Sequence, residues 1–404
     1  MKYYNAKDIR NIAVAGHAGR GKTTLVEAML YIAGLTDRLG RVDDGTAVLD
    51  FDPEERRRNV SVSAAIAPIE WKDCKLNIID TPGLFDFEGE MCEGIAASEC
   101  VLIVLGAGHK YDVGAEKAFK AAKKRGKMFA ITRCDKEHAD FYKTFEEIKA
   151  VHGGAVCPVI VPYIVDGQVK AYVNLAARKG YEYHDGNAVE IPMPDDPKIQ
   201  EMLDILTEAV ATASDELMEK FFAGEEFTRK EIIKALNDGV NTSSVYPVYA
   251  CSGYTTDGVD LLMDELAYSA PDAASYAGGK DVECDENGPL AALCFKTVAD
   301  PFVGKLAAIT IYIGNKNLIR AVAYRQKQVL FYPFSRRHLH RIIVLVNVII
   351  RFQSFDLDLS YAVCLLPIGQ NHLDRKIPAS FYVSVIAAHH IHADLIFCII
   401  PACC

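Results

Sequence analysis

The sequence predicts an α/β fold built on a doubly wound, mostly parallel sheet, and two observations support this prediction. Over the first 155 residues, short apolar runs alternate with amphipathic stretches of helical spacing. That alternation is typical of parallel strands connected by covering helices. The chain also has 404 residues, of which 50% are hydrophobic and 24% charged, so it is long enough for a large buried core and is not globally disordered.

The individual elements follow from the apolar runs. Strands are expected at 12–15, 76–79, 101–105, 129–131 and 245–250, and helices at 23–33, 115–125, 141–151 and 258–267. A segment at about 155–242 separates the fourth strand from the fifth and is expected to form an α+β insertion subdomain. It contains two apolar runs joined at Asp166-Gly167, a second Asp-Gly turn at 185–186, and helical spacing from Ile199 onward.

Residues 1–270 are therefore expected to form one domain, followed by further segments of different composition. The stretch 271–288 is rich in Ala, Gly, Ser and Asp and is expected to be a linker. Residues 289–314 are expected to begin a β-barrel domain, with strands at about 290–298 and 306–312.

The tail at 315–404 differs from everything before it. It carries 10 Lys+Arg and 4 Asp+Glu, and it contains one Gly and no Glu, Thr or Met. Against a net charge of −10 for the whole chain, the tail is at +6 and the preceding 314 residues are at −16. One hypothesis is an out-of-frame or misassembled sequence in a truncated chain. The alternative is a genuine hydrophobic interaction tail.

Charge and hydropathy restrict the class of protein. An acidic balance argues against a protein that coats DNA. The N-terminus lacks the apolar region of a signal peptide, and the longest aliphatic run, at about 342–350, is about half of the ~20 residues that a membrane span requires. The twelve cysteines include no C-x-x-C pair. We expect a cytoplasmic monomer with reduced thiols and no membrane association.

The strongest motif is an intact G-x-x-x-x-G-K-[ST] that directly follows the first apolar run and opens a helix. Its glycines would let backbone N–H groups face phosphates, its lysine would reach the β- and γ-phosphates, and its threonine hydroxyl would bind Mg²⁺. The alternative is a glycine-rich turn without a ligand. The candidate nucleotide-binding residues here are Gly16, His17, Ala18, Gly19, Arg20, Gly21, Lys22, Thr23 and Thr24.

Three later segments lie at the ends of predicted strands and add residues to the candidate site. Asp80-Thr81-Pro82-Gly83 could hold the Mg²⁺ water shell through Asp80 and sense a γ-phosphate through the Gly83 N–H. In Thr132-Arg133-Cys134-Asp135, the Asp135 carboxylate could accept from the N1–H and N2–H₂ edge of guanine, or it could only cap a helix. Cys251-Ser252-Gly253 would place a backbone N–H near guanine O6. GTP or GDP with Mg²⁺ is the ligand expected.

With these motifs, the chain resembles a translational GTPase of the elongation factor G type. The resemblance runs from Asn11 to about Gly314. Further segments that carry it are Gly40–Thr46, Glu54–Ser61, Asp86-Phe87 and Glu216–Lys220. It implies a P-loop NTPase domain, hydrolysis of GTP, and action on the ribosome. It also implies Thr23, Ser61 and Asp80 as the residues around Mg²⁺.

Three positions depart from the pattern of this family. Leu84 stands where the family has a His that positions the attacking water, so fast hydrolysis is not expected. Ser61 replaces a Thr but keeps the hydroxyl. Thr132 replaces an Asn that links the base segment to the phosphate loop, and its loss is expected to weaken binding by about 1–3 kcal/mol.

Alternative functions follow from the same residues. A pseudo-GTPase that binds GTP and hydrolyses it poorly is one, and a ribosome-protection GTPase of the tetracycline-resistance type is another. Two other groups have less specific interpretations. The basic residues at 120–127 could contact ribosomal RNA or could be a solvated helix end. His389, His390 and His392 lack the spacing of a metal site.

Overall fold

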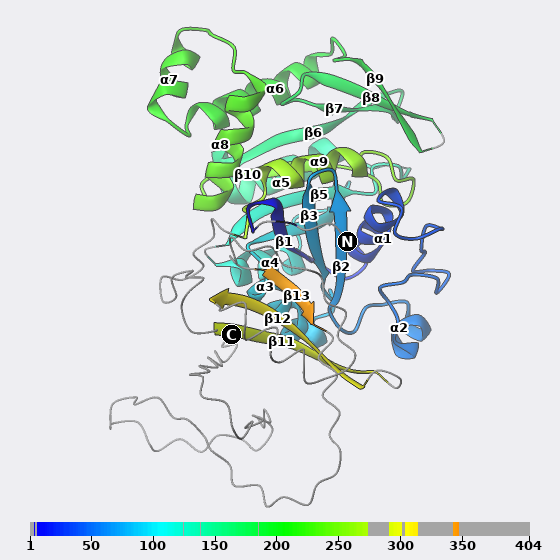
Figure 1. The fold of residues 1–404 in the computed structure, drawn as a ribbon. Helices are drawn as coiled ribbons and strands as arrows, with labels where there is room; N and C mark the ends of the chain where they lie inside the picture. Colours follow the sequence, from blue (N-terminus) through cyan, green and yellow to red (C-terminus); the bar gives the residue numbers. More distant parts are fainter. Residues whose placement is uncertain are drawn as a thin grey trace, which may run out of the picture.

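The computed structural model describes residue 4 and residues 6–313, apart from 124, 138, 185, 274–290 and 301–303, together with a strand at 342–346. Its largest part is a layered α/β unit around a ten-stranded sheet (Figure 1), so the predicted fold class is confirmed. The strand order is β2 (Ala65–Trp71), β3 (Cys74–Asp80), β1 (Ile9–Ala15), β4 (Cys100–Gly106), β5 (Gly126–Thr132), β10 (Tyr246–Ala250), β6 (Val156–Val165), β7 (Gln168–Asn174), β8 (Lys179–His184) and β9 (Asn187–Pro192).

The centre of the sheet is parallel. Strand β1 pairs in parallel with β3 and β4, β4 pairs with β5, and β5 pairs with β10. Every residue of β4 and β5 is buried, as expected for strands covered by helices on both faces. The covering helices are α1 (Lys22–Ile32), α3 (Glu88–Ala96), α4 (Val113–Ala122), α5 (Phe141–His152) and α9 (Val259–Ser269). Because these strands are parallel, their carboxyl ends and the loops that follow lie along one edge of the sheet.

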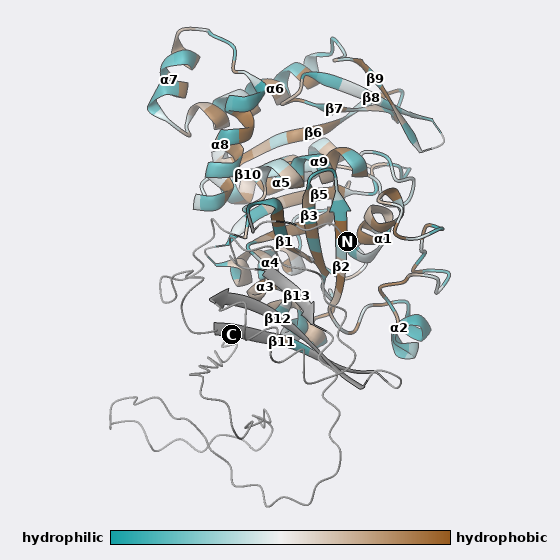
Figure 2. Ribbon diagram, in the orientation of Figure 1, coloured by the Kyte–Doolittle hydropathy of each residue, from teal (hydrophilic) through white to brown (hydrophobic). Residues whose placement is uncertain are grey.

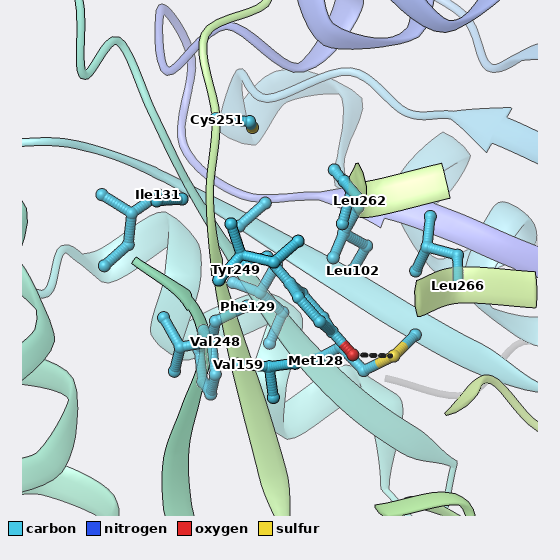
Figure 3. Packing of buried hydrophobic residues seen from close by; sticks show 14 of the residues in the cluster. Leu102, Met128, Phe129, Ile131, Val159, Val248, Tyr249, Cys251, Leu262 and Leu266 are labelled. Atoms are coloured by element: carbon cyan, nitrogen blue, oxygen red, sulfur yellow. Dashed lines mark hydrogen bonds between the residues drawn. The ribbon is translucent and has the colours of Figure 1, made fainter. Parts of the chain in front are cut away.

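The core lies between the sheet and these helices. Figure 2 shows the hydrophobic residues concentrated on the central strands. Tyr249 on β10 is fully buried, and its hydroxyl lies 3.8 Å from the Met128 sulfur on β5 (Figure 3). Leu262 and Leu266 of α9 belong to the same buried cluster. Burying each such side chain stabilises the fold by roughly 1.5–3 kcal/mol, which fixes β10 and its following loop beside β5.

The predicted insertion extends the central sheet instead of forming a separate one. Strand β6 pairs in parallel with β10, and β7, β8 and β9 continue from it as an antiparallel meander (Figure 1). At the first hairpin, Asp166 and Gly167 both have positive φ, 52° and 75°, as the Asp-Gly pair predicts. Three helices follow, α6 (Pro197–Ala211), α7 (Asp215–Phe222) and α8 (Arg229–Thr242). Helix α6 packs on β6, α7 packs on α6, and α8 packs on β5, β10 and α9.

A second, three-stranded antiparallel sheet contains the two strands predicted after the linker. It consists of β11 (Ala291–Asp300), β12 (Gly304–Ile313) and β13 (Ile342–Val346). Strand β13 comes from the tail of unusual composition and pairs with β12. The rest of that tail, its histidines, and most of the predicted linker lie outside the described residues. Among the helices that are described, none combines the length and the hydrophobicity needed to cross a bilayer.

Candidate nucleotide and metal site

The phosphate loop connects the end of β1 to the start of α1. Gly16, Gly19 and Gly21 all have positive φ, at 136°, 72° and 87°. A Cβ at Gly16 would lie 2.6 Å from the backbone oxygen of Val104 on β4, so only glycine allows the loop to cross β4 this closely. The loop is thereby fixed on the sheet edge, with the positive end of the α1 dipole next to it.

Lys22 and Gly83 come together at this loop, as the sequence predicted for two residues of one site. The Lys22 Nζ donates a hydrogen bond of 3.0 Å to the backbone oxygen of His17, and burial lowers the pKa of Lys22 to about 8. A Cβ at Gly83 would lie 2.3 Å from that Nζ and 2.6 Å from the Ala18 nitrogen. The segment after β3 therefore lies directly against the phosphate loop.

The predicted metal residues form one connected chain of hydroxyl and carboxylate groups. The Thr23 Oγ1 donates to the Asp80 Oδ2 at 2.6 Å and lies 2.9 Å from the Ser61 Oγ. Ser61 in turn donates to the Oδ1 of Asp50 at 2.8 Å. Ser61 and Asp80 follow Thr23 by 38 and 57 residues in the sequence, and only the fold brings the three together.

This group fits Mg²⁺ by its geometry and its chemistry. The Oδ1 of Asp80 and the Oδ2 of Asp50 are buried without a hydrogen-bond partner among the described residues. Burial raises the pKa of Asp80 to about 7 and also raises the pKa of Asp50, and a bound cation would favour the ionised forms. The 2.9 Å between the two hydroxyl oxygens matches neighbouring ligands of an octahedral shell with bonds of about 2.1 Å.

Asp50 is a site residue that the sequence pattern did not indicate. It is 4% exposed and lies in the irregular segment between helix α1 and the short helix α2 (Pro53–Arg58). The only sequence signal was an aspartate between two hydrophobic residues, Leu49 and Phe51, in a stretch without helical or strand periodicity. Asp50 joins the candidate metal site only because the chain folds back over α1.

At the base end, Thr132 keeps the connection that it was expected to lose. Its Oγ1 donates to the backbone oxygen of Arg20 in the phosphate loop at 2.7 Å and lies 3.2 Å from the Leu105 oxygen. The link to the phosphate loop is therefore kept, and the expected cost to binding stays a prediction. The short Thr132 side chain reaches the loop because the loop passes close to it. A Cβ at Gly21 would lie 3.3 Å from the Thr132 Oγ1.

Asp135 is exposed and is oriented by the loop that follows β10. The Ser252 Oγ donates to the Asp135 Oδ1 at 2.6 Å and accepts from the Thr255 N–H at 3.1 Å. The Cys251 N–H donates to the Ile131 oxygen at 3.1 Å. Gly253 lies against the start of α1, where an added Cβ would be 3.0 Å from the Thr24 oxygen. The predicted base residues thus form one connected unit beside the phosphate loop.

Leu84 lies at the other end of the site, beside Phe85 and the Glu88–Lys117 ion pair. It lines a small pocket together with Phe85, Met91 and Lys117. The Phe85 ring lies 5.5 Å from the ring of His17, and the Lys117 Nζ lies 4.7 Å from the Phe85 ring centre. Leu84 itself offers no proton donor or acceptor to a water molecule.

Two members of the basic segment at 120–127 are structural. Lys127 is 3% exposed, and its Nζ donates to the Lys123 oxygen at 2.7 Å. Arg125 donates from its Nε to the Ser98 oxygen at 3.0 Å. These cations bind carbonyl groups at the ends of helices and are not a free patch for RNA. Lys120 is exposed and pairs with Glu116.

Comparisons with known proteins agree with this site. Residues 7–272 match the model of the elongation factor Tu GTP binding domain. Among solved structures, the chain is similar to ttk003000868 from Thermus thermophilus, with a TM-score of 0.69 and 30% sequence identity. That match covers 76% of this chain and 46% of the Thermus chain, so the chain spans less than half the length of that protein. The match over 7–272 includes the phosphate loop, the hydroxyl and carboxylate chain and the base segment, and the protein therefore belongs to the GTPase family defined by the elongation factor Tu GTP-binding domain.

Proposed function

We propose that this protein binds GTP and GDP together with Mg²⁺ and acts on the ribosome as a translational GTPase of the elongation factor G type. The observation that supports it best is the convergence, at one edge of the sheet, of a phosphate loop, a group of four oxygen-bearing side chains that includes Thr23, and the exposed carboxylate of Asp135. The ribosome is the partner proposed from the resemblance, and the place of action would be the cytoplasm.

Each group in the site has a chemical role in this proposal. The backbone N–H groups of the phosphate loop and Lys22 would contact the phosphates. The hydroxyls of Thr23 and Ser61 and the carboxylates of Asp80 and Asp50 would hold Mg²⁺ directly or through water, and the cation would neutralise phosphate charge. Asp135, oriented by Ser252, would accept hydrogen bonds from guanine.

A binding protein with slow hydrolysis is the second candidate, and Leu84 favours it. In this proposal the pocket around Leu84 places a hydrocarbon side chain where a water-positioning group would be needed. Nucleotide binding and metal binding do not depend on that side chain, so occupancy could be signalled without fast turnover.

Multiple-turnover GTP hydrolysis with and without ribosomes tests both candidates. Ribosome-stimulated turnover that disappears in Lys22→Ala would support the enzyme. Tight binding of a fluorescent GDP without such turnover would support the binding protein. Absence of nucleotide binding by the unaltered chain, with the fold intact by circular dichroism, would overturn both.

A further inference from the structure

The strap, defined here as residues 61–64, connects Ser61 of the metal site to strand β2. Its first three residues donate hydrogen bonds to buried carboxylates. Asp50 accepts the hydroxyl of Ser61 at 2.8 Å, and Glu55, which is 1% exposed, accepts the N–H groups of Val62 at 2.9 Å and Ser63 at 3.1 Å. Ordering of this strap therefore determines where the Ser61 hydroxyl lies.

The last residue of the strap is held from two other elements. The Ala64 N–H donates to the Glu90 Oε2 of α3 at 2.7 Å, and the Ala64 oxygen accepts a hydrogen bond from the Lys296 Nζ of β11. The same Nζ lies 3.0 Å from the Glu90 Oε2. One ammonium and one carboxylate thus bind both backbone groups of Ala64 and each other.

The lysine end of this contact is shielded from solvent. The Lys296 side chain is 9% exposed and that of Glu90 is 30% exposed. The neighbouring Phe295 is 6% exposed and belongs to a cluster with Ala64, Ile79 and Ala97. The ammonium has two acceptors there, the carbonyl of Ala64 and the carboxylate of Glu90.

We infer that Lys296 is a positioning residue for the metal end of the nucleotide site. It lies outside the matched GTP-binding domain, yet it fixes the residue three positions after Ser61. Removing its charge would free the Ala64 carbonyl and leave Glu90, which accepts the Ala64 N–H, without its cation. The strap would loosen, so that the Ser61 hydroxyl no longer keeps its 2.9 Å spacing from Thr23. The metal-dependent part of nucleotide affinity therefore depends on β11. This inference rests on the proposed nucleotide function.

The test compares Lys296→Met and Lys296→Arg in the full chain. We expect Lys296→Met to reduce by about three- to tenfold the gain in mant-GTPγS affinity that Mg²⁺ provides over EDTA, with the affinity in EDTA unchanged. Lys296→Arg should restore most of that gain. Lys72→Met is the control, because it removes another lysine–carboxylate pair, with Asp264, at the opposite end of strand β2 from the strap.

Limited trypsin digestion gives a readout that does not require nucleotide. Arg57 and Arg58 stand just before the strap, separated from it by Asn59 and Val60, and their side chains are 73% and 55% exposed. Cleavage after these residues should be faster in Lys296→Met and in Glu90→Gln than in the Lys72→Met control. If Lys296→Met does not fold, Glu90→Gln carries the test, because it keeps the shape of the side chain.

The outcomes separate this inference from the proposed function. Equal Mg²⁺ dependence and equal trypsin cleavage in folded Lys296→Met and unaltered protein would overturn the positioning role. If the unaltered chain binds no mant nucleotide, the proposed function fails, and the digestion alone decides whether Lys296 fixes the strap.

Discussion

The proposed base segment (132–135) and the segment after β3 (80–87) each contain a substitution relative to the translational GTPases that the chain resembles, and the two substitutions have different consequences in the structure. At the base end, Thr132 replaces an amide with a hydroxyl that still reaches the Arg20 oxygen at 2.7 Å. At the other end, Leu84 presents only hydrocarbon to the pocket that it lines and has no polar group to offer. A substitution that preserves a hydrogen-bonding atom can be compensated by geometry, whereas one that removes every such atom cannot.

The largest expected effect tests this comparison at Leu84. Leu84→His should raise ribosome-dependent GTP turnover by about 10²–10⁴-fold, because it supplies a group that can position or deprotonate water. Affinity for GDP should change by less than about twofold. Steady-state phosphate release is the measurement, and Leu84→Ala, which opens space without a polar group, is the control. A rate unchanged in Leu84→His would show that hydrolysis is limited elsewhere.

At the base end, Asp135→Asn should reduce affinity for mant-GDP by about 100-fold, because hydrogen bonds to a charged group contribute about 1.5–3 kcal/mol each. The Asn amide can instead donate to a carbonyl at the same edge, so affinity for xanthosine diphosphate should rise. Fluorescence titration with both nucleotides measures this. Ser252→Ala, which removes only the orienting hydrogen bond, should show a smaller loss for GDP. An unchanged GDP affinity in Asp135→Asn would exclude Asp135 as the guanine reader.

A more moderate loss of GDP affinity is expected for a substitution at Thr132. Thr132→Val keeps the shape of the side chain but removes the hydrogen bond to Arg20, and the site is 2% exposed. We expect about a tenfold loss of GDP affinity, because an unsatisfied buried carbonyl costs about 1–3 kcal/mol. Thr132→Ser, which keeps the hydroxyl, should stay close to the unaltered protein. Equal binding by the Val and Ser variants would mean that this hydrogen bond does not support the base site.

The smallest expected effect concerns the side chain of Arg20. Its Nε pairs with the Asp112 Oδ2 at 2.8 Å, and the two side chains are 19% and 16% exposed. Arg20→Met should lower the free energy of unfolding by about 1 kcal/mol without removing the backbone oxygen that Thr132 uses. Urea unfolding measures it, with Lys120→Met as the control for a more exposed pair. A large loss of GDP affinity in Arg20→Met would show that the side chain also contributes to the site.

Much of the fold could be predicted because apolar periodicity survives in the structure. The predicted strands at 12–15, 76–79 and 101–105 lie inside β1, β3 and β4. Strand β2 was missed, although it forms the edge of the sheet beside β3. Its buried residues alternate with partly exposed ones, and it contains a proline, Pro68, which an edge position tolerates. That tolerance depends on neighbours which the sequence does not reveal.

Groups whose role depends on local spacing could be predicted from the amino-acid sequence alone. The phosphate loop requires glycines, a lysine and a threonine at fixed distances along the chain, and its function depends on the turn between one strand and one helix. The Asp-Gly hairpin at 166–167 is fixed in the same way. These features can be predicted because their geometry is set by a few consecutive dihedral angles.

Contacts between distant segments depend on the tertiary structure and could not be predicted from the sequence. Asp50 joined the metal residues, Thr132 reached the phosphate loop 112 residues away, and Lys296 bound the strap from 232 residues away. Hydrogen bonds depend on distances within a few tenths of an ångström, and such distances between remote segments are set by how the sheet and its helices pack. No pattern along the chain encodes them.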